Sequence, residues 1–248
     1  MSIESEKDVA GLKECGRVVG LTLREMTRHA VPGITTGELD AIGEAFLHRH
    51  GARSAPKLTY NFPSATCISV NDEAAHGIPG DRILKAGDMV NIDVSADLDG
   101  YITDTGATMA IPPVSPTKQK LMDCTKAALS NAIAAAQSGR SLNVIGQAVQ
   151  LQARRCGFTI VENLTGHGLG RRLHEAPDMV LNYYDAREKR KLSDGLVIAV
   201  EPFLSTGARY VTESGDGWTL KTPNKNLIAQ YEHTIIIRKG QPLIVTLV

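Results

Sequence analysis

The chain has 248 residues, of which 42% are hydrophobic and 22% charged, and 27 basic residues balance 27 acidic ones. This composition is typical of a globular protein with a sizeable core, and its zero net charge excludes a general basic field for nucleic acid or anionic membranes. The start, Met1–Asp8, is acidic and polar, and no run of 18 apolar residues occurs. We therefore expect no secretion signal and no bilayer span.

Two helical segments are expected. The first extends from Lys7 to His50, with apolar residues at steps of three and four, and is interrupted by the turn Val31–Thr36. Thr36 is the expected N-cap of the helix after that turn. The second segment, Ser115–Arg155, repeats the same order of helix, turn and helix.

An internal duplication would explain this repetition. Gly33 and Gly139 are as far apart in sequence as Gly51 and Gly157, and each of the latter two ends an apolar-periodic helix. We therefore predict related halves of about 7–113 and 114–248.

Strand-like sequence follows each helical segment. The strand-like segments are Ala65–Val70 and Met89–Ala110 in the first half, and Leu196–Leu204, Gln230–Arg238 and Leu243–Val248 in the second. No low-complexity linker separates the halves. We expect a single α+β domain over residues 1–248, with a pseudo-two-fold central antiparallel sheet covered by helices.

The segment from Val90 to Gly106 predicts a hairpin with a polar face. Asp99-Gly100 is a strong two-residue turn signal, and counting back from it pairs Ser95 with Asp104. Asp93, Ser95, Asp97 and Asp104 then share one face, with Asp93 and Asp104 roughly 7–8 Å apart as diagonal neighbours. This face is either the solvated side of a hairpin or part of a metal site.

Three further residues favour the metal site. His167 lies in the glycine-rich sequence Gly166–Gly170, which allows close approach of a ligand. Glu201 ends an apolar strand and Glu232 precedes another, and each is either a surface residue at a strand end or a buried, paired carboxylate. Two Asp, two Glu and one neutral His are the donors expected for two divalent ions, of Mn, Fe, Co or Zn.

The cysteines give no sign of a second kind of metal site. Cys15, Cys67, Cys124 and Cys156 are scattered without a C-x-x-C pair, which argues against a disulfide framework or a thiolate zinc site. We expect a reducing compartment and a cytoplasmic protein.

Taken together, these segments resemble the type I methionine aminopeptidases, which belong to the pita-bread family with prolidase and creatinase. The resemblance covers nearly the whole chain and is carried by motifs in the same order. The motifs are Cys67–Asn71, His76–Pro79, the hairpin from Asp93 to Asp104, Gly166–Gly170, His174–Pro177, Val200–Pro202 and Gln230–Thr234.

The resemblance implies a role for each candidate residue. Asp93 would chelate one metal ion, His167 and Glu201 the other, and Asp104 and Glu232 would bridge the two. His76 and His174 would contact the substrate beside the scissile bond, where a neutral imidazole can donate a proton or a hydrogen bond. Asp97 has no ligand role in the family.

The implied reaction is removal of the initiator methionine from nascent proteins and peptides when the second residue is small. The nucleophile would be a hydroxide held between two divalent ions, with cobalt and manganese among the candidates. Glu201 would shuttle the proton. The resemblance implies that methionine is bound by Phe62, Cys67, Phe203 and Trp218, with Tyr60 nearby. The alternative is that these residues belong to the ordinary hydrophobic core. Leu173 and Ala176 depart from the common Phe and Glu of the family. The implied partners are a polypeptide N-terminus and the ribosome surface, with no specific nucleic acid and no membrane, for a monomer.

Two alternatives remain. A related Xaa-Pro dipeptidase would share the metal ligands but usually carries an additional N-terminal domain, which we do not expect here. A non-catalytic interaction module of the same fold would have lost metal ligands, whereas all five are present.

Overall fold

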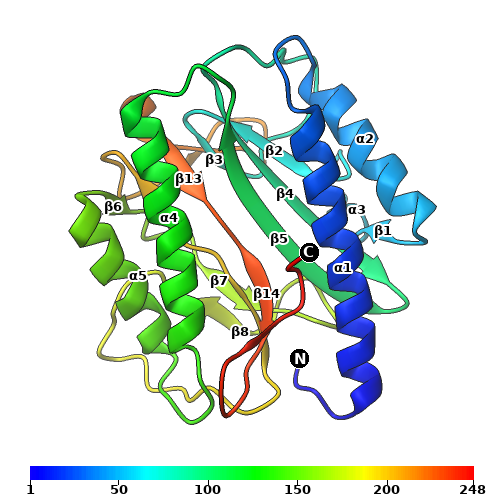
Figure 1. The fold of residues 1–248 in the computed structure, drawn as a ribbon, viewed down its shortest axis with the longest axis vertical. Coiled ribbons are helices and arrows are strands. Elements are labelled where there is room, and N and C mark those ends of the chain that lie inside the picture. Colours follow the sequence, from blue (N-terminus) through cyan, green and yellow to red (C-terminus); the bar gives the residue numbers. More distant parts are fainter.

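Four long helices form one layer of the computed structural model, which describes residues 1–248. They are α1 (Glu6–His29), α2 (Thr36–Arg49), α4 (Pro116–Ala135) and α5 (Asn143–Cys156). Figure 1 shows α1 and α4 lying over the strands, with α2 and α5 outside them. The two helical segments expected from sequence periodicity are therefore confirmed, each as a pair of helices.

Polar side chains cap three of these helices. Ser5 and Thr35 each form a capping box, with Asp8 and Glu38 respectively, and Ser115 caps α4. The expectation that Thr36 is the N-cap of α2 is wrong by one residue. Thr35 takes this place because its hydroxyl reaches the main-chain nitrogen three residues on, and Thr36 bonds instead to Gly80.

The predicted hairpin consists of β4 (Met89–Leu98) and β5 (Tyr101–Ala110). Its register pairs Leu98 with Tyr101 and Ser95 with Asp104, as the turn predicts. Asp99 and Gly100 have positive φ of 53° and 78°, which is the conformation that a tight hairpin turn requires. On its other edge β4 pairs with β1 (Arg53–Ser54) and β2 (Cys67–Val70).

A second sheet has the strand order β15-β14-β9-β7-β8. Its strands are β7 (Gly166–Gly168), β8 (Glu175–Val180), β9 (Val197–Val200), β14 (His233–Ile236) and β15 (Leu243–Ile244). The remaining elements are α3 (Ala55–Tyr60), β3 (Glu73–Ala75), β6 (Thr159–Ile160), β10 (Phe203–Ser205), β11 (Thr212–Glu213), β12 (Leu220–Lys221), a 3-10 turn at Pro223–Lys225, and β13 (Ile228–Gln230). All strand pairs are antiparallel.

The two sheets meet along β5 and the segment between β13 and β14. Asp104 N donates to Thr234 Oγ1 at 2.8 Å, and Thr105 Oγ1 donates to the main-chain oxygen of Glu232 at 2.7 Å. Ala107 and Tyr231 form an isolated antiparallel bridge. These contacts fix Asp104 and Glu232 beside each other although they are distant in sequence.

The core lies between the helices and the strands. Ile92, Val94 and Ala96 of β4 are buried in one cluster with apolar residues of α1 and α2, such as Leu12 and Leu39. A second cluster joins α4 and α5 to β9, β13 and β14. Because side chains alternate along a strand, the other face of β4 and β5 is left free to form a site.

Two expectations change with the structure. Cys124 of α4 and Cys156 at the end of α5 form a disulfide, whereas we expected none; packing of neighbouring helices brings them together over a sequence separation of 32. The cysteine pattern therefore no longer favours a reducing compartment.

None of the helices combines the length and hydropathy needed to cross a membrane. The internal duplication stays a prediction.

Candidate active site

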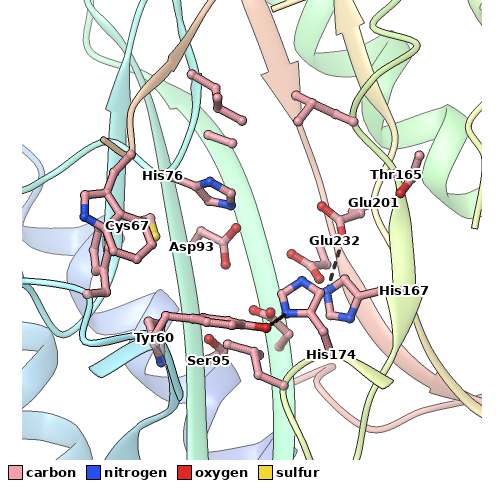
Figure 2. Close-up of a pocket in the computed structure, with 18 of the residues that line it drawn as sticks. Tyr60, Cys67, His76, Asp93, Ser95, Thr165, His167, His174, Glu201 and Glu232 are labelled. Carbon is pink, nitrogen blue, oxygen red and sulfur yellow. Dashed lines mark hydrogen bonds and ion pairs between the residues drawn. The ribbon is translucent and has the colours of Figure 1, made fainter. Parts of the chain in front are cut away.

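A pocket of about 440 Å³ opens on the polar face of the hairpin (Figure 2). All eleven candidate site residues line it: Phe62, Cys67, His76, Asp93, Asp104, His167, His174, Glu201, Phe203, Trp218 and Glu232. They come from the two larger sheets, from β10, which carries Phe203, and from the connecting segments. The structure therefore gathers into one cavity every residue that the motifs select.

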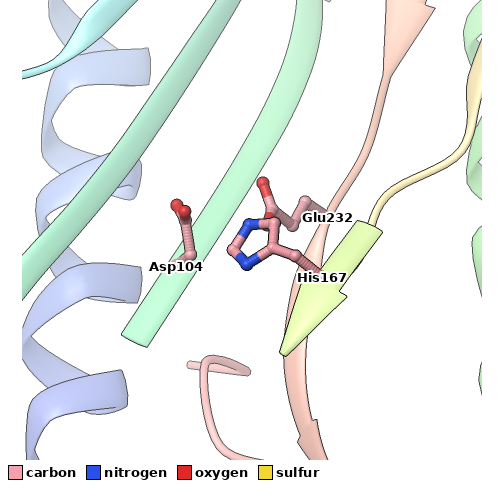
Figure 3. Close-up of side chains that lie close together, drawn as sticks. All are labelled: Asp104, His167 and Glu232. Atoms are coloured by element: carbon pink, nitrogen blue, oxygen red, sulfur yellow. The ribbon is translucent and has the colours of Figure 1, made fainter. Parts of the chain in front are cut away.

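Asp104, His167 and Glu232 form the tightest group in this pocket. One potential ligand atom from each lies within 4.8 Å of the other two, and all three residues are buried (Figure 3). Glu201 is next to this group, because its Oε1 is 3.5 Å from His167 Nε2. Asp93 lies across from them on β4, on the side of His76 (Figure 2).

The ring of His167 is oriented by its own strand. Its Nδ1 lies 3.0 Å from the main-chain oxygen of Gly168, which can only accept a hydrogen bond. Nδ1 therefore carries the proton, and Nε2 presents a lone pair to the pocket. Burial first, then His174 and His76, lower the pKa of His167 to about 3, so the ring is neutral at physiological pH.

The four carboxyl groups destabilise one another when ionised. Burial raises the pKa of Asp93 to about 6. The pKa values of Asp104, Glu201 and Glu232 are all raised, first by burial and then by neighbouring negative charges. A cluster of this kind requires positive charge to be ionised at neutral pH.

Two oxygens of the cluster have no protein partner. Asp104 Oδ1 and Glu232 Oε1 are buried and make no hydrogen bond, although buried polar atoms are nearly always satisfied. Both face the same cavity as His167 Nε2. Carboxylate oxygens with one imidazole nitrogen are suitable ligands for divalent transition metals, so the residues present fit such ions.

His76 is held at the pocket wall by an unusual main chain. It adopts a positive φ of 54°, which is uncommon for a residue other than glycine. Gly77 follows it, and a Cβ atom there would lie 2.3 Å from the main-chain oxygen of Ile68. The His-Gly sequence thus brings the imidazole into the pocket by a close approach to β2. Burial lowers the pKa of His76.

His174 has a partner that sequence reasoning missed. The Tyr60 hydroxyl lies 2.7 Å from His174 Nδ1, and the His174 ring is 3.9 Å from that of His167. Tyr60 was selected from the sequence only as a residue near the pocket. The hydrogen bond joins residues 114 apart, and no local pattern signals it.

One end of the pocket is apolar. Phe62 and Trp218 pack edge to face at 5.1 Å, and Phe203 is fully buried beside β13. Burial, followed by the charge of Asp93, raises the pKa of Cys67 well above its usual range, so the thiol is neutral. Leu173, which departs from the family pattern, is buried and lines the pocket, whereas Ala176 is exposed and does not.

Asp97 takes no part in the pocket. It shares the hairpin with Asp93 but pairs with Arg53 of β1 at 3.1 Å.

The chain is similar to known proteins over nearly its whole length. The model of metallopeptidase family M24 matches residues 10–239. The chain is 49% identical to methionine aminopeptidase 2 of Bacillus subtilis, over 99% of each chain. The chain belongs to metallopeptidase family M24. The resemblance to methionine aminopeptidases is thereby confirmed.

Solved structures give the same result. A crystal structure of methionine aminopeptidase from Rickettsia prowazekii matches with a TM-score of 0.95 and 37% identity over the full length of both chains. The prolidase of Pyrococcus furiosus matches with a TM-score of 0.79 but only 18% identity, over 99% of this chain and 65% of that one. The second match shows a shared fold alone.

The raised carboxyl pKa values predict how stability depends on pH in protein freed of metal. In the unfolded chain Asp93 titrates near 3.8, and in the folded chain near 6. Protonation therefore favours folding, so this contribution is present at low pH and is lost as the pH rises from 3.8 through about 6.

We expect Asp104→Asn to raise the melting temperature of metal-free protein at pH 8 by about 2–4 °C for each kcal/mol of repulsion relieved.

The control is Asp97→Asn, which removes a charge from the same hairpin outside the pocket. Calorimetry of both variants with and without chelator makes the comparison. An Asp104→Asn protein that melts below wild type at pH 8 without metal would contradict the predicted repulsion.

Proposed function

We propose that the protein removes N-terminal methionine from nascent polypeptides and peptides, with a preference for a small second residue. The observation that carries this proposal is the buried cluster of four carboxyls and one neutral imidazole, which lies beside an apolar pocket. The relatives support it, because those at 46–49% identity are named methionine aminopeptidases.

The proposed metal ligands are those that the motifs predict. Asp93 would bind one divalent ion, His167 and Glu201 the other, and Asp104 and Glu232 both. When bound, the two ions would neutralise the carboxylates, lower the pKa of a water molecule and polarise the scissile carbonyl. The unpartnered oxygens of Asp104 and Glu232 support the bridging role. The ions would be Co, Mn, Fe or Zn.

The protein's own residues would bind the substrate and move protons. His76 and His174, whose pKa values are lowered mainly by burial, are neutral and can each donate a hydrogen bond to the reacting carbonyl group or its amide. Glu201 would take a proton from the attacking water and return it to the departing amine. The free α-amine of the substrate would bind at the metal site, which would restrict hydrolysis to the first peptide bond.

The apolar end of the pocket would select methionine. Phe62, Phe203 and Trp218 provide aromatic surface, and the neutral thiol of Cys67 provides a small polarisable contact. An unbranched thioether side chain is well accommodated by such a surface. Leu173 is smaller than the Phe that is common in the family, so the pocket would be wider beside it.

Ribosome contact, a monomeric state and a cytoplasmic location remain predictions from the resemblance. Selectivity between N-terminal methionine and Xaa-Pro substrates is part of the proposal and is open to a direct test.

The test of the proposal is peptide hydrolysis by metal-reconstituted protein. We expect release of methionine from Met-Ala-Ser, little release from Met-Leu-Ser and no cleavage of Xaa-Pro peptides. Chromatography of the products measures each of these outcomes. Asp104→Asn should abolish release because it removes a bridging carboxylate. Folded, metal-loaded protein that releases no methionine would contradict the proposed activity, and cleavage of Xaa-Pro alone would favour the dipeptidase alternative.

His76→Ala tests the role of this imidazole. We expect turnover to fall by about 10²–10⁴-fold, the usual range for a general acid or base, while metal content stays that of wild type. Elemental analysis and steady-state kinetics on one preparation make the comparison. Loss of metal from the variant would instead show that His76 is a ligand.

Tyr60→Phe tests whether the tyrosine orients His174. Losing one neutral hydrogen bond should lower kcat about 2- to 10-fold with little change in KM. Tyr184→Phe is the matched control, because Tyr184 is 45% exposed and Tyr60 44%, and Tyr184 lies outside the pocket. Equal kcat for Tyr60→Phe and wild type would show that the contact does not orient the ring.

A further inference from the structure

Asp40 of α2 carries a buried carboxylate that the proposed reaction does not use. The residue is 8% exposed and does not line the pocket. No Lys, Arg or His forms an ion pair with it. Burial raises the pKa of Asp40, and the hydrogen bonds that it accepts offset only part of this increase. A buried carboxylate without a cation is costly, so its presence requires an explanation.

All hydrogen bonds of the Asp40 side chain join it to the segment that precedes β2. Its Oδ1 accepts from Thr66 N at 2.8 Å and from Thr66 Oγ1 at 2.7 Å, and its Oδ2 accepts from Ala65 N at 3.1 Å. Ala65 and Thr66 are fully buried, and neither N–H has a main-chain partner. Asp40 therefore satisfies two buried donors that would otherwise be unpaired.

The segment that Asp40 holds has no regular secondary structure. α3 ends at Tyr60 and β2 begins at Cys67, so residues 61–66 belong to neither element. Ala65 is fixed from its other side as well, because its main-chain oxygen accepts from Ser54 Oγ at 2.8 Å. The two side chains thus fix the peptide groups before and after Ala65, where no neighbouring strand does so.

Both ends of the pocket segment, defined as residues 62–67, line the apolar end of the pocket. Phe62 packs edge to face against Trp218 at 5.1 Å, and Cys67 lies at the other end of the segment. Burial is the main cause of the raised pKa of Cys67, and the charge of Asp40 adds to it. A shift of this segment would therefore move two of the residues proposed to bind methionine.

The residues proposed to act on the scissile bond are held by other contacts. His76 is fixed through Gly77, whose main-chain oxygen accepts from Ile68 N at 3.0 Å. Asp93 lies within the long hairpin of β4 and β5. Loss of the Asp40 contacts should therefore disturb the methionine side-chain pocket more than the reacting groups.

The alternative is that Asp40 only joins α2 to the sheet. The helix already has other attachments, because Leu39 is buried in the core and Gly37 N donates to Gly80 O at 2.8 Å. The pocket segment has no such substitute for the two main-chain bonds that Asp40 accepts. This difference favours a role in shaping the pocket.

We propose that Asp40 is a positioning residue that sets the selectivity for methionine. Its carboxylate fixes the pocket segment, so that Phe62 and Cys67 form one rigid wall against an unbranched side chain. This inference deepens the proposed aminopeptidase function and rests on it.

Asp40→Asn tests the proposal with little change in size. The amide oxygen can still accept from Thr66, but the NH₂ group would face Ala65 N–H, so that donor loses its acceptor. In metal-reconstituted protein we expect KM for Met-Ala-Ser to rise about 10-fold while kcat changes by less than about 2-fold. The ratio of kcat/KM for Met-Ala-Ser to that for Leu-Ala-Ser should fall about 10-fold, because a less rigid wall accepts a branched side chain more easily.

Tryptophan fluorescence provides a second readout that does not require activity. Trp218 is the only tryptophan of the chain, and it packs against Phe62 of the pocket segment. We expect acrylamide to quench its fluorescence more strongly in Asp40→Asn than in wild type, because the edge-to-face packing is loosened.

Asp88→Asn is the matched control. The carboxylate of Asp88 also accepts hydrogen bonds, from Asn71 Nδ2 at 2.8 Å and from Lys85 N at 2.9 Å, and it lies outside the pocket. We expect this variant to lower the melting temperature without changing the substrate ratio or the quenching of Trp218.

Thr66→Val replaces Asp40→Asn if the latter does not fold. Valine has nearly the shape of threonine and removes only the hydroxyl bond to Asp40, while both main-chain bonds remain. The substrate ratio should fall in the same direction by about 2- to 5-fold. An unchanged ratio in folded Thr66→Val would then overturn the proposal.

The outcomes separate the two proposals. If wild-type protein releases no methionine from any peptide, the aminopeptidase activity is wrong, and the quenching of Trp218 still decides whether Asp40 fixes this wall. If wild type is active and Asp40→Asn keeps its substrate ratio and quenching, the positioning role is overturned even when the melting temperature falls. Equal changes in Asp88→Asn would overturn it as well.

Discussion

The structure depends on keeping four mutually repelling carboxyl groups beside one neutral imidazole in one pocket. Burial and neighbouring charges raise the pKa values of Asp104, Glu201 and Glu232, so the cluster is unfavourable when ionised without cations. The main chain resists this repulsion, because Asp104 and the Glu232 segment are joined by Thr105 and Thr234 across two sheets. The resulting high density of acceptors gives the site its affinity for divalent ions.

Local rules predicted much of the fold. The Asp99-Gly100 turn set the register of β4 and β5, because a two-residue turn with positive φ allows one pairing only. Gly51 and Gly157 follow α2 and α5 with φ of 73° and 79°, which L side chains rarely adopt. The site residues could also be selected before the fold was known, since several short motifs in a fixed order identify a family better than any single one.

Contacts between distant residues could not be predicted. The Cys124–Cys156 disulfide depends on how α4 packs against α5, and the Tyr60–His174 hydrogen bond on where α3 meets the loop between β7 and β8. Both contacts join segments by tertiary packing, for which periodicity and turn signals carry no information.

Anomalous diffraction from crystals grown with manganese tests most directly whether this cluster binds two ions. We predict two peaks inside the pocket, one nearer Asp93 and the other nearer His167, with the carboxylates of Asp104 and Glu232 between them. A single peak outside the pocket, or no peak in a correctly folded crystal, would contradict a dinuclear centre.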